Sequence, residues 1–430
     1  MVLSIPRRDA VDPLLAAAPV VERLVLPKGT DPWSFVAALP LSAPAWYWHD
    51  PDAGETLAAA FAIAAGTGEP QWDAWSELVS RIREQCDGAV RLWFGGARSG
   101  ADRVAATMPA DRAWMVPGLT VRRDQTGVAA WLCGDAETRR ALRAICERAS
   151  TGSDALEVVA ETRWDEIATD SCADWNARVE AVRGAIRDGR LHKAVPSRRV
   201  WFRADRVDAM HAGLRARLRR TPDRVALLVE QESGLFAAAT PETLFTVAAD
   251  GTLRTHALAG TLAPGATIDA FLDNARLREE HELVVADICK VLESLGLAPQ
   301  AATPRVRPAG AVCHLETPIL AHGADRCTPQ QLRNALHPTA AIVGAPRREA
   351  AAFIDALEPF SRGWFAAPFG WTDGGRNKAV IAIRSVWLDD SGAHALVGAG
   401  IVADSEPDLE WEETERKLDN MRQMIGMVNA

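Results

Sequence analysis

The stretch 407–418, Pro-Asp-Leu-Glu-Trp-Glu-Glu-Thr-Glu-Arg-Lys-Leu, begins a helix that the sequence predicts from Pro407 to Val428. Proline fits a first helical turn because its missing N–H costs no hydrogen bond there, and Ser405 is the expected cap. Residues three and four apart share one face of a helix. One face of this predicted helix therefore carries Glu410, Glu413, Lys417, Met421 and Met424. This face begins charged and ends apolar. It is either a solvated surface with Glu413–Lys417 pairing or a carboxylate site.

A second predicted helix, 268–295, combines charge and apolar character in a similar way. Its apolar stripe is Val284, Ile288, Val291 and Leu295. Glu280 precedes Val284 by four residues and extends the same stripe. A buried carboxylate is costly unless it has a partner or a metal ion. Two such helices can share one divalent cation, and oxygen ligands favour Mg²⁺ over zinc. A salt-bridged surface is the alternative.

The segments between these helices mix strands and helices without regular alternation. A helix is expected from Ala173, with Asp174 as its cap, and Gly189 fits the position just after its end. Strands are predicted at 191–202, 225–230, 235–239, 244–247, 378–387 and 393–402. This pattern favours an α+β fold with large antiparallel sheets flanked by helices over a doubly wound parallel sheet.

The N-terminal third lacks a recognisable chemical motif. Strand-like runs at 89–94 and 114–121 are followed by a helical stretch at 135–149. We expect residues 1–160 to form a covering layer of the same fold and residues 161–430 to form the catalytic core.

Composition excludes several classes of protein. The formal charge is 48 − 57 = −9, which argues against a nucleic-acid-binding surface, because phosphate neutralisation requires clustered Lys and Arg. No apolar run approaches the roughly 20 residues needed to span a bilayer, and residues 1–12 lack the apolar core of a signal peptide. The seven cysteines form no CxxC pair. We expect reduced thiols, mostly buried, in a cytoplasmic protein.

An ordered series of short motifs resembles the chorismate-binding enzymes of menaquinone, siderophore and tryptophan biosynthesis, and isochorismate synthases most of all. The series spans about Asp174 to Met424. Its members are Lys193-Ala-Val-Pro-Ser-Arg, Thr240-Pro-Glu-Thr-Leu-Phe, Ala257-Leu-Ala-Gly-Thr, Glu279-Glu-His, His314-Leu-Glu-Thr-Pro-Ile, Leu336-His-Pro-Thr, Gly344-Ala-Pro-Arg, Arg362-Gly-Trp-Phe, Ala382-Ile-Arg, Gly398-Ala-Gly-Ile-Val and Glu410-Trp-Glu-Glu-Thr-Glu-Arg-Lys. Each motif alone is weak, whereas the ordered series is strong evidence, because chance would not keep both order and spacing.

The resemblance implies Mg²⁺-dependent isomerisation of chorismate to isochorismate. Water adds at C2 while the C4 hydroxyl leaves, so the reaction needs a base and an acid. By position, Lys193 matches the general base and Glu242 the general acid. A lysine acts as a base only where its charged form is disfavoured, for example by burial, and desolvation keeps a glutamic acid protonated. Without the resemblance, both would be ordinary strand and turn residues.

The resemblance also implies the ligands of the substrate and the metal. Chorismate has two carboxylates, and Arg384 and Lys417 match the residues that contact them. Further pocket positions are Gly260, Thr261, His337, Ala341, Gly398 and Gly400. Glycine allows the backbone to approach a ligand closely. Mg²⁺ would be bound by Glu280 and Glu413 directly and by Glu410 through water.

Comparison among the relatives favours isochorismate synthase. Lys193 argues against anthranilate synthase, and Ala259 stands where aminodeoxychorismate synthases carry a lysine nucleophile. Salicylate synthases, which also eliminate pyruvate, typically have Thr at the position of Ala341 and Tyr at that of Phe365. A salicylate synthase and a catalytically silent chorismate-binding protein remain the alternatives. The expected protein is a monomer or weak homo-oligomer, with no nucleic-acid or membrane partner.

Overall fold

A computed structural model describes residues 19–37, 45–67, 71–96, 112–150, 164–204, 224–231, 233–262, 265–309 and 312–427, with positions 14, 109, 214, 217 and 218. The predictions made for residues 1–12, for the boundary at residue 160 and for the helix end at Val428 lie outside this part of the chain. Within it, no helix is both long and apolar enough to cross a membrane.

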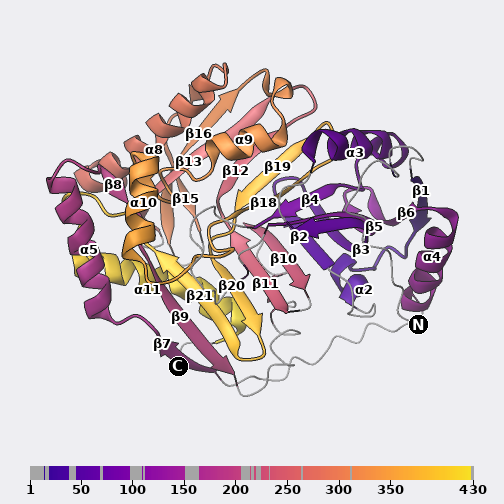
Figure 1. Ribbon diagram of the computed structural model, residues 1–430, viewed down its shortest axis with the longest axis horizontal. Coiled ribbons are helices and arrows are strands. Elements are labelled where there is room, and N and C mark those ends of the chain that lie inside the picture. The colour runs from indigo at the N-terminus through magenta and orange to yellow at the C-terminus, as the bar shows by residue number, and fades with distance from the viewer. Residues whose placement is uncertain are drawn as a thin grey trace.

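The described strands form a large antiparallel sheet to which both halves of the chain contribute. Nineteen strands within the described residues belong to it. Strand β2 (Ala45–Asp50) pairs with β10 (Val225–Gln231), and β4 (Leu92–Gly95) pairs with β18 (Pro368–Thr372). Figure 1 shows β1–β6 on one side of the molecule and α5, α8 and α10 on the other. The predicted α+β fold with large antiparallel sheets is confirmed.

Helices cover both faces of the sheet. Successive side chains of a strand point to opposite faces. In β2, Trp46 and Trp48 accordingly enter one hydrophobic core, and Tyr47 enters another. The first core receives α3 (Trp72–Cys86), α5 (Cys172–Arg187), α8 (Ala275–Ser294), α9 (Pro329–Leu336) and α10 (Arg347–Leu357). The second receives α2 (Pro32–Ala37), α4 (Ala136–Ser150) and α11 (Pro407–Ile425).

The remaining elements complete the order along the chain. In the N-terminal part they are β1 (Val20–Val25), β3 (Glu55–Thr67), β5 (Ala113–Asp124), β6 (Gly127–Gly134) and β7 (Trp164–Ala168). The rest are β8 (Lys193–Ala194), β9 (Ser197–Ala204), β11 (Gly234–Thr240), β12 (Thr243–Val247), β13 (Leu253–Leu262), α7 (Ile268–Leu272), β14 (Gln300–Ala301), β15 (Arg305–Pro308), β16 (Cys313–Ala321), β17 (Gly344–Ala345), β19 (Asn377–Ile381), β20 (Ser385–Asp389) and β21 (Gly392–Gly398), with a 3-10 turn at Ala324–Arg326.

Three elements that the sequence predicts as continuous are broken. The strand at 191–202 divides into β8 and β9 around Pro196, which has no N–H to give to a ladder. The helix at 268–295 divides into α7 and α8 because the side chain of Asn274 accepts the N–H of Leu277 and starts a new helix. The strand at 378–387 divides at Arg384, whose φ of 53° is left-handed. Predicted strand 393–402 ends early, at Gly398.

The helix caps differ from the prediction in detail. Ser171, not Asp174, caps α5. The carboxylate of Asp174 accepts the backbone N–H of Ser171, which completes a capping box. Gly189 follows α5 with φ of 73°, as predicted. Ser405 does not cap α11, because its hydroxyl accepts the N–H of Val402 instead, and Glu406 occupies the cap position.

Candidate active site

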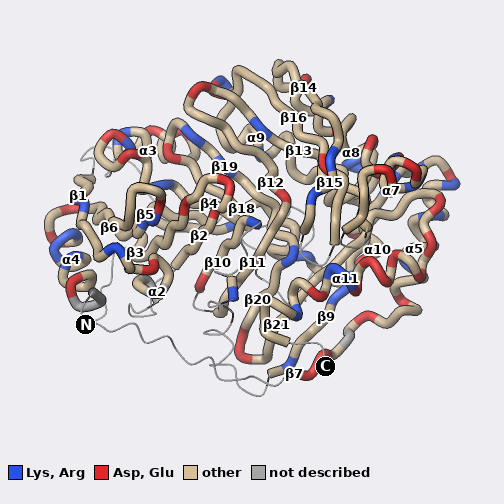
Figure 2. The backbone as a smooth tube through the Cα atoms, turned by 180° about the vertical axis from the view of Figure 1, so that it is seen from behind, with Lys and Arg blue, Asp and Glu red and all other residues tan. Residues whose placement is uncertain are grey.

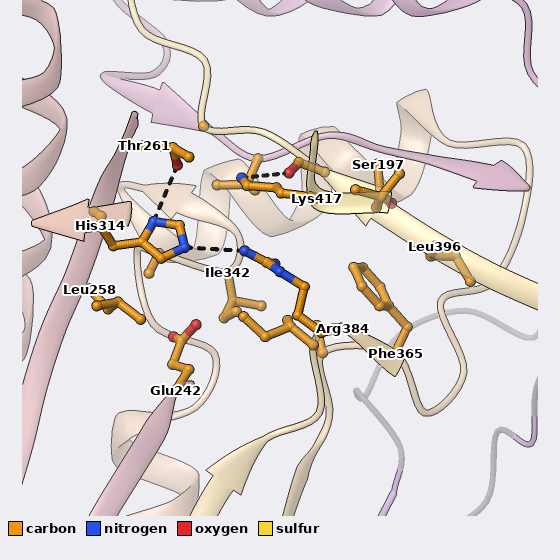
Figure 3. A pocket seen from close by; sticks show the side chains of 18 of the residues that line it. Ser197, Glu242, Leu258, Thr261, His314, Ile342, Phe365, Arg384, Leu396 and Lys417 are labelled. Atoms are coloured by element: carbon orange, nitrogen blue, oxygen red, sulfur yellow. Dashed lines mark hydrogen bonds between the residues drawn. The ribbon is translucent and has the colours of Figure 1, made fainter. Parts of the chain in front are cut away.

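One pocket gathers most of the predicted site residues. It encloses about 710 Å³ of space that no protein atom fills, including its open mouth. Its walls come from β8, β9, β13, β16, β21, α8, α11 and the turns that follow β11 and β19. The predicted residues that line it are Lys193, Glu242, Gly260, Thr261, Glu280, Ala341, Arg384, Gly398, Gly400 and Lys417. Figure 3 shows Glu242 and Lys417 on opposite sides of a central His314–Arg384 pair.

Lys193 lies on the short strand β8, which is fixed on both sides. It pairs with Ala345 of β17, while Ala194 exchanges backbone hydrogen bonds with Ile401. The Lys193 side chain is 1% exposed, and its Nζ lies 3.0 Å from Oε1 of Glu280 on α8. A buried ion pair therefore occupies this wall of the pocket.

Glu242 lies in the turn between β11 and β12 and is well suited to hold a proton near neutral pH. Its backbone N–H is bonded to Oγ1 of Thr240 at 3.1 Å, and its carbonyl accepts the N–H of Ile381 at 2.9 Å. Burial raises the pKa of Glu242 to about 7, although the charges of Arg384, Lys193 and Lys417 act in the opposite direction. Near pH 7 this carboxyl group can act as an acid.

Arg384 lies in the break between β19 and β20 and has an unused donor. Its Nη2 is 3.1 Å from Nε2 of His314, and its Nε is buried without a hydrogen-bond partner. Burial lowers the pKa of Arg384 to about 10, so the guanidinium remains charged at pH 7. Because a buried donor without a partner is costly, this side chain is suited to an anion in the pocket.

His314 is the active-site residue that the sequence prediction missed. Burial, followed by the charge of Arg384, lowers its pKa well below the usual value, so the ring is neutral. Its Nε2 faces a donor on Arg384, so the proton is on Nδ1, 3.3 Å from both the Gly260 carbonyl and Thr261 Oγ1. It therefore orients Arg384. His314 is the first residue of one of the motifs quoted above, and that motif was the signal in the sequence that could have identified it.

Lys417 and Glu413 form an ion pair on α11 that faces the pocket. Nζ of Lys417 lies 2.6 Å from Oε1 of Glu413 and donates to the carbonyl of Gly398 at 2.9 Å. The pKa of Glu413 is lowered because Lys417 and Arg276 outweigh the opposing effect of burial. The helical spacing placed both residues on one face, and the structure buries that face.

Each residue predicted to bind metal is paired with a cation: Glu280 with Lys193, Glu413 with Lys417 and Glu410 with Arg276. Burial and then the neighbouring Glu413 raise the pKa of Glu410 to about 8, and Glu280 acts in the same direction. Glu410 is paired with Arg276 at 2.7 Å, yet its Oε2 is buried without a hydrogen-bond partner. No group of three or more His, Cys, Asp or Glu among the described residues is already arranged as a metal site. Mg²⁺ fits these oxygens because it commonly uses one or two carboxylates, water and substrate oxygens.

Two glycines are required by close contacts. A Cβ at Gly400 would overlap Oε1 of Glu280 and lie 2.9 Å from Cε of Lys193. Gly260 has φ of 75°, where β13 shifts register against β16 between Ala259 and Thr261. At both positions a side chain would disturb the pocket wall.

The predicted residues Glu410 and Glu413 are not part of the lining that the described residues form, and neither is His337. Its Nε2 lies 2.9 Å from the carbonyl of Ala366, which does line the pocket. His281, expected to be structural, bridges the Ala259 carbonyl at 3.2 Å and Thr317 Oγ1 at 2.7 Å.

A buried pair supports the wall that carries Lys193. Glu358 accepts the backbone N–H and the hydroxyl of Ser197 at 2.7 and 2.8 Å. Arg362 binds the same carboxylate and donates to the carbonyl of Val195 at 2.6 Å. Both sides of Pro196 are thereby fixed. Arg362 belongs to one of the motifs quoted above, although no role was predicted for it.

Known proteins that are similar to this chain include isochorismate synthases. The isochorismate synthase of salicylate biosynthesis from Pseudomonas aeruginosa is 35% identical over 267 residues, covering 60% of this chain and 55% of that protein. Isochorismate synthase MenF of Bacillus subtilis is 32% identical over 262 residues, covering 59% and 55%. The chain thus spans about half the length of these relatives.

The fold and the family are consistent with each other. The structure of MenF, the menaquinone-specific isochorismate synthase from Escherichia coli, superimposes with a TM-score of 0.77, covering 97% of this chain and 99% of that one, at 23% identity. The family model described as chorismate binding enzyme matches residues 18–426. The chain belongs to the chorismate-binding enzyme family.

Proposed function

We propose that this protein is an isochorismate synthase that isomerises chorismate to isochorismate with Mg²⁺. The observation that carries the proposal is a single pocket that combines a protonated acid with a buried lysine and an unpartnered arginine donor. The acid is Glu242, the lysine is Lys193 and the donor is Nε of Arg384. The names of the relatives support the same reaction.

The charge of the pocket suits a dianionic substrate. The protein carries a net charge of −9, and Figure 2 shows acidic and basic residues interspersed along the described backbone. Attraction for chorismate must therefore come from local cations. Arg384 and Lys417 supply them within the pocket lining. Arg384 would bind one substrate carboxylate, and the fixed ring of His314 keeps its guanidinium directed to one place.

The proposed proton transfers use Lys193 as the base and Glu242 as the acid, the roles that the resemblance implies. Lys193 would take a proton from the water that attacks C2. Glu242 would give its proton to the C4 hydroxyl, which leaves as water while the double bonds shift. One water enters and one leaves, so the step is a net isomerisation. Each positioned group of this kind contributes about 10²–10⁴-fold to a rate.

The carboxylates Glu280, Glu410 and Glu413 would hold Mg²⁺. The ion would fix a substrate carboxylate by binding its oxygens, and the unpartnered Oε2 of Glu410 supports this placement. Glu280 now neutralises the ammonium of Lys193.

The proposal is tested by chromatography of the products after the full chain is incubated with chorismate and Mg²⁺. Isochorismate without salicylate or pyruvate is the expected result. Salicylate with pyruvate would instead identify a salicylate synthase and contradict the meaning given to Ala341 and Phe365, which both face the pocket. No product, even with added ammonium, would favour a binding protein without this activity.

A further inference from the structure

A histidine outside the pocket lining binds the backbone next to the proposed acid. The backbone N–H of Thr243, the residue after Glu242, donates to Nε2 of His256 on β13 at 3.2 Å. A ring nitrogen that accepts a hydrogen bond cannot carry the proton, so Nδ1 carries it in the neutral ring. Nδ1 lies 3.4 Å from Oε1 of Glu316 on β16, close enough for the charge of that carboxylate to favour a proton on Nδ1.

The surroundings of His256 fix this arrangement. Burial, and then the charge of Arg307, lowers the pKa of His256 to about 4, with opposition from Glu316. The ring is thus neutral at pH 7. Glu316 is held by Arg305 at 2.5 Å and by Arg307 at 2.6 Å, and Arg307 Nη1 is also 3.5 Å from Nδ1. The Thr243 N–H at Nε2 and the Glu316 carboxylate near Nδ1 both favour the tautomer in which Nε2 accepts, against the Arg307 donor that also faces Nδ1.

The bond to His256 replaces a missing contact between strands. β12 and β13 pair only at Thr246–Arg254 and Val247–Leu253, beyond the end that carries Glu242. On the other side of β12, the register with β19 shifts between Thr243 and Phe245. Thr243 itself pairs with Val380 of β19, but on the side that faces β13 its N–H has no strand partner and uses a side chain instead.

We propose that His256, oriented by Glu316, is a positioning residue that fixes the backbone at Thr243 and so keeps the carboxyl of Glu242 aimed into the pocket. The other two anchors of this turn are Thr240 Oγ1 on the Glu242 N–H and the Ile381 N–H on the Glu242 carbonyl. Loss of the third anchor lets the turn move, and misplacement by about 1 Å can cost roughly 100-fold in rate. This inference rests on the proposed function of Glu242.

A matched pair of variants tests it. His256→Gln places an amide oxygen near the position of Nε2, whereas the shorter His256→Asn stays polar but cannot reach the Thr243 N–H. We expect His256→Asn to lower kcat by roughly tenfold or more with KM within about twofold, and His256→Gln to recover most of the rate. His322→Asn, at the far end of the β13–β16 pair, should retain the wild-type rate.

Hydrogen exchange of the peptide that contains residues 240–247 gives a readout independent of turnover. Exchange at Thr243 should be faster in His256→Asn than in the wild type and in His256→Gln. If His256→Asn and His256→Gln had the same turnover and the same hydrogen exchange at Thr243, the positioning role of His256 would be overturned. If the wild type did not consume chorismate, the proposed function would fail, and the exchange measurement would still decide whether His256 holds this turn.

Discussion

Nζ of Lys193 and Oε1 of Glu280 lie 3.0 Å apart in a buried ion pair between β8 and α8. The proposed base and a proposed metal ligand are therefore in direct contact. Engagement of Glu280 with Mg²⁺ and the electrostatic surroundings of Lys193 are therefore expected to be coupled. Gly400 leaves the space in which these two side chains meet.

Replacing Glu280 should weaken metal and substrate binding together. Glu280→Gln removes one carboxylate and its negative charge, so the Mg²⁺ concentration for half-maximal turnover should rise by roughly tenfold or more, with a parallel loss of chorismate affinity. The exposed neighbour Glu279 provides the control, as Glu279→Gln. An unchanged metal titration in Glu280→Gln would place the ion elsewhere.

Lys193→Gln should abolish measurable turnover, with a loss of about 10²–10⁴-fold, because the attacking water has no base. The amide still offers Glu280 a polar partner, so the fold should survive, as circular dichroism can verify. The exposed Lys290, changed to Gln, is the matched control. Substantial remaining activity would remove Lys193 as the base.

The raised pKa of Glu242 predicts how turnover and stability depend on pH. Its pKa of about 7 lies above the ordinary value of 4.5, so the acidic form and the turnover that needs it are lost as pH rises through 7. Between about pH 4.5 and 7 the folded state binds more protons than the unfolded state, so this group lowers stability as pH rises.

Glu242→Gln should therefore lose turnover and gain stability. Its melting temperature relative to the wild type should increase from pH 5 to pH 8, an effect of a few kcal/mol at most. A difference in melting temperature that does not change with pH would show that the carboxyl is not held protonated by the fold.

Gly400→Ala should impair the site and leave the fold intact. The new methyl group would overlap the carboxylate of Glu280 and crowd Lys193, so turnover should fall by at least about tenfold. Gly184 lies within α5 with no atom within 4 Å of an added Cβ. Gly184→Ala should keep full activity and gain up to about 1 kcal/mol in unfolding free energy. Full activity in Gly400→Ala would show that the pocket tolerates this displacement.

Arg384→Lys should weaken chorismate binding by roughly tenfold or more, because an ammonium cannot form the two parallel hydrogen bonds of a guanidinium. Quenching of tryptophan fluorescence by chorismate measures the dissociation constant. Arg254→Lys, at an exposed position of β13, is the control for the replacement of an arginine by a lysine. Equal affinity in Arg384→Lys and the wild type would exclude a bidentate contact.

Much of the fold could be predicted because periodicity and turn residues are local signals. The shared face of Glu413 and Lys417 follows from helical spacing alone, and the structure buries it. The breaks at Pro196, Asn274 and Arg384 were missed because the flanking apolar runs suggested continuous elements. At Arg384 the strand gives way to a left-handed residue whose side chain meets His314, which lies far away in the sequence.

The missed site residues share a physical cause. His314 and His256 act through contacts across strands, with Arg384 and with the Thr243 N–H respectively. No spacing within one segment can indicate such pairs. His337, in contrast, was selected for its motif, but its ring binds the Ala366 carbonyl behind the pocket wall.

The most direct test of the account is the fate of the oxygen atom during turnover. The full chain is incubated with chorismate and Mg²⁺ in water enriched in ¹⁸O, and the product is analysed by chromatography with mass detection. Water activated at Lys193 and protonation of the leaving hydroxyl by Glu242 predict isochorismate that carries one ¹⁸O atom at C2. Isochorismate without the label, or no isochorismate at all, would contradict the account.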